Sequence, residues 1–168
     1  MERVNEDLPP TRPSAAIPGP VITRSEATWR GDRSFDAGPQ GRTHRIDVAA
    51  KEAPGPVETL LNALATCSAI DVIDILEKRR TPVEKMTIHI AAERRPQAPR
   101  RVMYLEIEYR IDGADIEREH AERAVQLSYE RYCSVAASLA PDIIAETRVT
   151  LNGEAGAASR REAWTPLT

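Results

Sequence analysis

The stretch Gly55–Arg80, GPVETLLNALATCSAIDVIDILEKRR, predicts a long helix around which the rest of the chain is organised. Its aliphatic side chains leave hardly any face of such a helix polar; they are Leu60, Leu61, Leu64, Ile70, Val72, Ile73, Ile75 and Leu76. A helix that is apolar nearly all round is buried by other elements rather than laid on a surface. Pro56 and Glu58 suit its first turn, and Pro82 follows its end. Cys67 therefore stands in the middle of a buried helix.

The burial of this helix requires more material than one chain offers. Only one other long helical segment and a few strands are predicted to cover residues 57–76. Covering the remaining faces with a second copy is the simplest solution, and symmetric dimers are the commonest oligomers. We therefore expect a homodimer.

Composition indicates which partners and which cellular compartment to expect for this chain. The chain has 168 residues and a net charge of −3, with 23 Lys and Arg against 26 Asp and Glu. This length suits one domain, and this charge provides no basic surface for nucleic acid or anionic lipid. No amino-terminal stretch has the apolar core of a signal peptide, so we expect a cytoplasmic protein. Asp71 and Asp74 interrupt the central apolar stretch, which we expect to be too short to span a membrane.

Alternating apolar and polar residues predict strands on both sides of the central helix. Before it, the alternation falls within residues 21–29 and 44–48, with a short strand through Phe35 between them. After it, residues 84–94 and 101–111 form a long antiparallel hairpin. A second helix is predicted from Asp115, its N-cap, to Cys133, followed by a short helix within 134–140 and a final strand over 143–151. This order predicts an α+β fold with an antiparallel sheet and a long buried central helix.

The two ends of the chain differ from this central domain. Residues 1–20 hold five prolines and few apolar residues, so we expect a flexible N-terminal arm. Residues 153–168 are small, polar and rich in Gly and Ala, so we expect a loose C-terminal tail with Trp164 as its anchor. The domain itself is then predicted to cover residues 21–152.

Three segments resemble the OsmC/Ohr family. The central stretch, GPVETLLNALATC, is similar to the central-helix motif of the family, in which a glycine, a glutamate and a pair of leucines precede a cysteine, here Cys67. The segment ERAVQLSYERYCSVAASL resembles the second motif, K-Y-C-x-V, which places the family's second cysteine at Cys133. Trp29–Phe35, WRGDRSF, is similar to the W-x-G-x-R-x-F strand-turn. The resemblance extends over roughly residues 20–152, which is most of the chain.

The resemblance implies a fold and a chemistry. The family fold is an intertwined α+β homodimer in which two long central helices are wrapped by sheets, and its better-known members are thiol-dependent peroxidases. Cys67 would attack an organic hydroperoxide and become a sulfenic acid. Cys133 would resolve it as a Cys67–Cys133 disulfide, which an external dithiol reductant then opens. The partners implied are therefore a second copy, an organic hydroperoxide and a dithiol.

The thiolate of a buried cysteine needs a cation. An ordinary thiol is only a few per cent thiolate at neutral pH, and burial disfavours the charged form further. Arginine suits this role because it stays charged when desolvated and can also bind a carboxylate. The family's arginine corresponds to Arg33, with Arg30 as the alternative.

Glu58 marks a departure from the peroxidase pattern. The glutamate that holds the arginine in those members stands ten residues before the cysteine, where this chain has Val57. Glu58 stands nine residues before Cys67, on the opposite side of a continuous helix. The chain thus resembles a less characterised branch with a shifted glutamate and the C-x-A-x-D-V continuation seen at Cys67–Val72.

Other interpretations of these residues remain open. A free cysteine is usually a small buried hydrophobe, an arginine in a turn is usually solvated, and Glu58 also suits a helix N-terminus. We expect no metal site, because no CxxC or HExxH spacing exists, and no cofactor, because no phosphate-binding glycine loop is present. The alternative function is a non-catalytic stress or binding protein with a small apolar ligand at the dimer interface.

Overall fold

The structure is a computed structural model that describes residues 21–161. The predicted N-terminal arm, residues 1–20, and Trp164, the expected anchor of the tail, lie outside the described residues.

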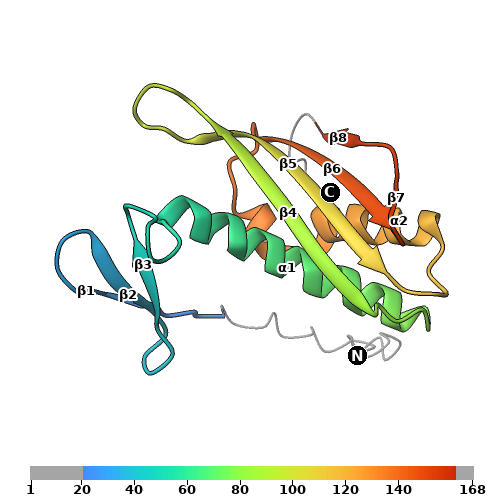
Figure 1. Cartoon of the computed structure of the whole chain (residues 1–168), viewed down its shortest axis with the longest axis horizontal. Helices are drawn as coiled ribbons and strands as arrows, with labels where there is room; N and C mark the ends of the chain where they lie inside the picture. Colours follow the sequence, from blue (N-terminus) through green and yellow to red (C-terminus); the bar gives the residue numbers. More distant parts are fainter. Residues whose placement is uncertain (1–20, 162–168) are drawn as a thin grey trace, which may run out of the picture.

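The first three strands form a small antiparallel sheet at one end of the molecule (Figure 1). They are β1 (Glu26–Trp29), β2 (Ser34–Gly38) and β3 (His44–Asp47), with β2 in the centre. The sequence prediction of three short strands is confirmed, although β1 is shorter than the predicted 21–29. Every residue from 21 to 30 is exposed, so this sheet has little cover within one chain.

The central helix α1 runs from Pro56 to Lys78, which confirms the long helix predicted from the sequence. Gly55 is its N-cap, and the Glu58 carboxylate accepts a hydrogen bond from the Gly55 N–H at 2.7 Å. Pro56 stands at the first helical position, where a missing N–H costs nothing. Helix α1 ends at Lys78 because Arg80 adopts a positive φ of 64° and Pro82 follows.

The second sheet contains five strands and is mixed. Strands β4 (Lys85–Arg94) and β5 (Val102–Asp112) form the expected antiparallel hairpin. Strand β6 (Ile144–Leu151) then pairs parallel with β5, with Tyr104 opposite Ile144. The expected antiparallel sheet is thus present with one exception. The parallel pair arises because the chain between β5 and β6 crosses over through helices instead of a tight turn.

The C-terminal segment is not a loose tail within the described residues. Strands β7 (Glu154–Ala155) and β8 (Ser159–Arg161) both pair antiparallel with β6. The prediction of a tail from residue 153 is therefore wrong for residues 154–161. These small polar residues form strands because β6 offers its free edge to them.

Three short helical segments connect β5 to β6. They are α2 (Arg118–Leu127), the π-helix η1 (Ser128–Tyr132) and α3 (Ser134–Ala137). The predicted helix from Asp115 to Cys133 thus starts later, with Glu117 instead of Asp115 at the N-cap, and its last turn is π-helical. The wider turn ends at Cys133, which leaves helical geometry before α3 begins.

The core lies between the second sheet and the two longer helices, which cover one face of that sheet (Figure 1). The inner face of α1 is fully buried; it consists of Leu64, Ser68, Val72 and Leu76. The opposite face is open in a single chain, where Leu60 is 40% and Ile70 is 60% exposed. Helix α1 therefore carries more apolar side chains than one chain buries. The prediction of a homodimer requires such an exposed apolar face.

Helix α1 is long and apolar enough, by length and composition alone, to cross a membrane. The expectation that this stretch is too short was wrong, because the helix runs for 23 residues. Core helices of globular domains meet the same criterion, and here one face of α1 packs against the sheet and α2.

Candidate functional site

Cys67 lies in the middle of α1, at the border between its buried and open faces. The residue is half-buried, whereas the next residue, Ser68, is completely buried. The Cys67 Sγ lies 4.0 Å from the Ser134 Oγ, which belongs to the first residue of α3. Leu60 and Ile70, the exposed apolar residues of α1, lie two turns before and one turn after Cys67. The thiol therefore combines partial access to solvent with apolar neighbours.

Cys133 lies beside Cys67 and is 1% exposed. It stands at the junction of η1 and α3, where its Sγ accepts a hydrogen bond from the Ala136 N–H at 3.3 Å. Burial raises the pKa of the Cys133 thiol well above its ordinary value, and the neighbouring Cys67 thiol raises it further, although the Ala136 N–H opposes this. Both cysteines are free thiols. The fold thus brings the two sequence motifs together.

Arg33 does not meet Cys67 within one chain. It is exposed in the turn between β1 and β2, and its side chain makes no hydrogen bond or ion pair with the residues that the structure describes. Its backbone carbonyl accepts a hydrogen bond from the Val48 N–H, which ties the turn to the end of β3. The Arg33 side chain is therefore accessible to solvent in a single chain.

Arg30, the alternative cation, is already paired. Its Nε lies 2.6 Å from an Asp36 carboxylate oxygen, and the Arg45 Nε lies 2.8 Å from the other. These two arginines, Arg45 first, hold the pKa of Asp36 below its ordinary value. Of the two arginines in the strand-turn, Arg33 is the one without a carboxylate partner among residues 21–161.

Glu58 serves α1 itself within this chain. Its carboxylate accepts a hydrogen bond from the Gly55 N–H, which is the half of a capping box that a glycine N-cap allows; this is a structural role that the sequence had left open. Nine helical residues separate it from Cys67, which corresponds to about 13 Å along the axis and the opposite side. Glu58 and Cys67 are therefore not brought together in one chain.

The sequence analysis missed a buried group of hydroxyls behind the thiols. The Tyr109 hydroxyl donates to the Ser68 Oγ at 2.8 Å, and the Ser128 Oγ donates to the Asp71 carboxylate at 2.8 Å. Tyr129 lies next to Tyr109 and Ser68. Burial raises the pKa of Tyr109 to about 12, so it is a neutral donor at physiological pH. The available signal was the presence of Ser68 and Asp71 in an otherwise aliphatic helix.

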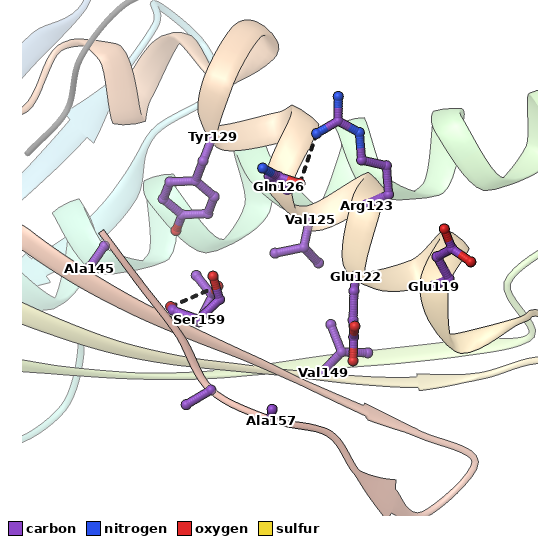
Figure 2. A pocket seen from close by; sticks show the side chains of 12 residues that line it. Glu119, Glu122, Arg123, Val125, Gln126, Tyr129, Ala145, Val149, Ala157 and Ser159 are labelled. Carbon is purple, nitrogen blue, oxygen red and sulfur yellow. Dashed lines mark hydrogen bonds between the residues drawn. The ribbon is translucent and has the colours of Figure 1, made fainter. Parts of the chain in front are cut away.

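A separate cavity of about 420 Å³ lies between α2, β6 and the segment before β8 (Figure 2). Figure 2 shows Val125 and Tyr129 projecting from the helical side toward Ala145 and Val149 of β6. Glu119, Glu122 and Arg123 also line this cavity, whereas neither cysteine does. It is therefore not the apolar pocket beside Cys67 that the binding-protein alternative requires.

No group of three or more His, Cys, Asp or Glu residues that could hold a metal ion occurs within residues 21–161. The two thiols themselves can carry out nucleophilic attack, oxidation and disulfide exchange.

Comparisons with known proteins identify relatives of this chain and of its fold. Protein YhfA of Escherichia coli (strain K12) is 42% identical over 88 residues, which are 52% of this chain and 66% of YhfA. The crystal structure of a hypothetical protein from Aquifex aeolicus VF5 has a TM-score of 0.72 at 26% identity and covers 79% of this chain and 97% of that one. The organic hydroperoxide resistance protein OhrB of Bacillus subtilis shares the fold, with a TM-score of 0.53 at 12% identity over 79% of this chain and 100% of its own.

The family model described as OsmC-like protein matches residues 49–148, more than half of the chain. The matched range contains α1 with Cys67, the β4–β5 hairpin and the segment that carries Cys133. The chain therefore belongs to the OsmC-like protein family.

Proposed function

We propose that this protein is a thiol-dependent peroxidase that reduces organic hydroperoxides in the cytoplasm. The observation that carries the proposal is the pair of free thiols, in which half-buried Cys67 lies beside buried Cys133. A reactive thiol needs access to its oxidant, whereas a resolving thiol only needs access to the first sulfur. Half-buried Cys67 therefore suits the reactive thiol, and buried Cys133 suits the resolving thiol.

The reaction has three balanced steps. The Cys67 thiolate attacks one oxygen of the hydroperoxide; the O–O bond breaks, an alcohol leaves and Cys67 becomes a sulfenic acid. The Cys133 thiolate attacks the Cys67 sulfur, which forms the disulfide and releases water. An external dithiol then reduces this disulfide and becomes a disulfide itself, so both thiols are restored without a metal or an organic cofactor.

A second copy of the chain completes the site in this proposal. The open face of α1 carries Cys67 together with exposed Leu60 and Ile70, and it is apolar enough to be covered by another subunit. Arg33 is exposed on a sheet that has little cover of its own. In the homodimer, Arg33 of a second copy stabilises the Cys67 thiolate, which has no cation beside it among residues 21–161 of its own chain.

The relatives support the substrate class, and the position of Glu58 supports a second candidate function. Several proteins with this fold are named organic hydroperoxide resistance proteins. In this chain, however, Glu58 caps α1 and Val57 occupies the position of the peroxidase glutamate. An arginine without a carboxylate to orient it favours the alternative, a non-catalytic stress or binding protein on the same dimeric fold.

The test is peroxide consumption together with product mapping. Reduced protein treated with one equivalent of cumene hydroperoxide should form a Cys67–Cys133 disulfide within one chain, and dithiothreitol should sustain turnover. Peptide mapping after digestion identifies the linked peptides. Two unmodified thiols under these conditions, or links only between different chains, would favour the binding protein.

Replacing Arg33 with methionine should slow alkylation of Cys67 at pH 7 by about tenfold, because a nearby cation favours the thiolate. Arg33→Lys should restore only part of the rate, since an ammonium group cannot bind a carboxylate in two places. Iodoacetamide kinetics, followed by mass spectrometry of the Cys67 peptide, measure the effect.

Arg30→Met is the matched control for this prediction, because Arg30 lies in the same strand-turn but is paired with Asp36. Its alkylation rate should equal that of the wild type. A decrease in Arg30→Met alone would transfer the role to Arg30, and unchanged rates in both variants would remove the cation from the proposal.

A further inference from the structure

We propose that Ser128 and Asp71 are positioning residues that hold Cys133 within reach of Cys67; this inference rests on the proposed disulfide step. Both residues lie in the segments that carry the thiols. Ser128 is the first residue of η1, and Asp71 lies on α1 one turn after Cys67.

Ser128 connects the two thiol-bearing segments directly. Its Oγ donates to the Asp71 carboxylate at 2.8 Å, and its backbone carbonyl accepts the Cys133 N–H, also at 2.8 Å. Residues four apart on a helix lie on the same face, so Asp71 marks the side of α1 that carries Cys67. One fully buried residue thus links that side of α1 to the backbone of Cys133.

The hydrogen bond from the Cys133 N–H to the Ser128 carbonyl spans five residues and belongs to the π-helix. Such turns are rare; most are single turns within α-helices, and they are frequent at functional sites. Cys133 follows this turn and has extended backbone geometry. It lies there beside Cys67 of α1. The Ser128–Asp71 hydrogen bond attaches this π-helical segment to α1.

A second buried hydrogen bond joins α1 to strand β5 next to Cys67. Ser68, the residue after Cys67, accepts from the Tyr109 hydroxyl of β5, and Tyr129 of η1 lies beside both. Helix α1 is therefore tied to the sheet at Ser68 and to η1 at Asp71. The surroundings of these polar groups are otherwise aliphatic, and an aliphatic side chain at position 128 would bury as well without linking the segments.

The chemical consequence concerns the rate and equilibrium of disulfide formation. Attack by the Cys133 sulfur on the oxidised Cys67 sulfur requires the two atoms to be held close and aligned. Loss of the link lets η1 and α3 move relative to α1, so the two thiols meet less often. The oxidation of Cys67 by hydroperoxide does not involve Ser128 and should be unaffected.

The experiment measures the equilibrium of the Cys67–Cys133 disulfide in mixtures of reduced and oxidised dithiothreitol. Ser128→Ala and Asp71→Ala should each lower the equilibrium constant by about tenfold, since each removes the hydrogen bond that joins the two segments. Asp71→Asn should remain within about twofold of the wild type, because the amide oxygen still accepts from Ser128. The double variant Asp71→Ala/Ser128→Ala should lose no more than either single variant.

Thr66→Ala is the matched control. Thr66 stands next to Cys67, but its hydroxyl bonds only to carbonyls of α1, so its removal should leave the equilibrium unchanged. Circular dichroism of each reduced variant checks that it is folded. If Ser128→Ala does not fold, Asp71→Ala and Asp71→Asn carry the comparison, because Asp71 is only half-buried.

The outcomes separate the positioning role from the peroxidase proposal. A wild type that forms the disulfide, with folded Ser128→Ala and Asp71→Ala indistinguishable from it, would overturn the positioning role alone. The same holds if Asp71→Asn loses as much as Asp71→Ala. A wild type that forms no Cys67–Cys133 disulfide in any mixture would overturn both proposals.

Discussion

Cys67→Ser should reduce hydroperoxide consumption to background, a loss of about a thousandfold or more, because a serine hydroxyl cannot replace the sulfur nucleophile. The substitution exchanges one small atom in a half-buried position, so the fold should persist. The measurement is the loss of cumene hydroperoxide in the presence of dithiothreitol, with circular dichroism as the check on folding. Undiminished consumption by Cys67→Ser would assign the activity to another residue.

Cys133→Ser provides the contrast and a pH dependence. This variant should still consume one equivalent of hydroperoxide, but it should accumulate the Cys67 sulfenic acid, which a dimedone adduct detects by mass.

In the wild type, burial raises the pKa of Cys133, so its neutral thiol predominates at pH 7. The thiolate fraction grows about tenfold for each pH unit below that pKa. Disulfide formation should therefore accelerate from pH 6 to pH 9, and a pH-independent rate would show that Cys133 is not the attacking group.

Ile70→Glu should convert the proposed homodimer into monomers. Ile70 is 60% exposed on the open face of α1, near Cys67, although it is large and apolar. Burying an isoleucine contributes about 1.5–3 kcal/mol, a symmetric interface contains it twice, and a buried carboxylate costs further free energy. We expect the dimer dissociation constant to rise by about a thousandfold or more.

Sedimentation equilibrium at micromolar concentration measures this change. Thr87→Glu is the matched control, since Thr87 is exposed on β4 and the same charge is introduced away from α1. A wild type that sediments as a folded monomer would contradict the dimer itself. If the dimer forms but Ile70→Glu leaves it intact, another face of the protein makes the interface.

The sequence by itself determined the elements that depend on local pattern. The apolar run of α1, its proline start and the alternation of β4 and β5 all concern neighbouring residues, so they were read correctly within a few positions. The excess of apolar residues on α1 also predicted the open face at Leu60 and Ile70, because a pattern records how much surface must be covered. The two cysteine motifs identified the thiols and the family.

Contacts between distant residues were decided only by the tertiary structure. The parallel pairing of β5 with β6 and the strands of residues 154–161 depend on which sheet edge is free, and no local pattern encodes that. The capping role of Glu58 depends on the orientation of one side chain at the start of α1. The links from Ser68 to Tyr109 and from Asp71 to Ser128 join residues 41 and 57 positions apart. A polar residue in the sequence shows that a partner is needed, whereas the folded chain alone selects which partner it meets.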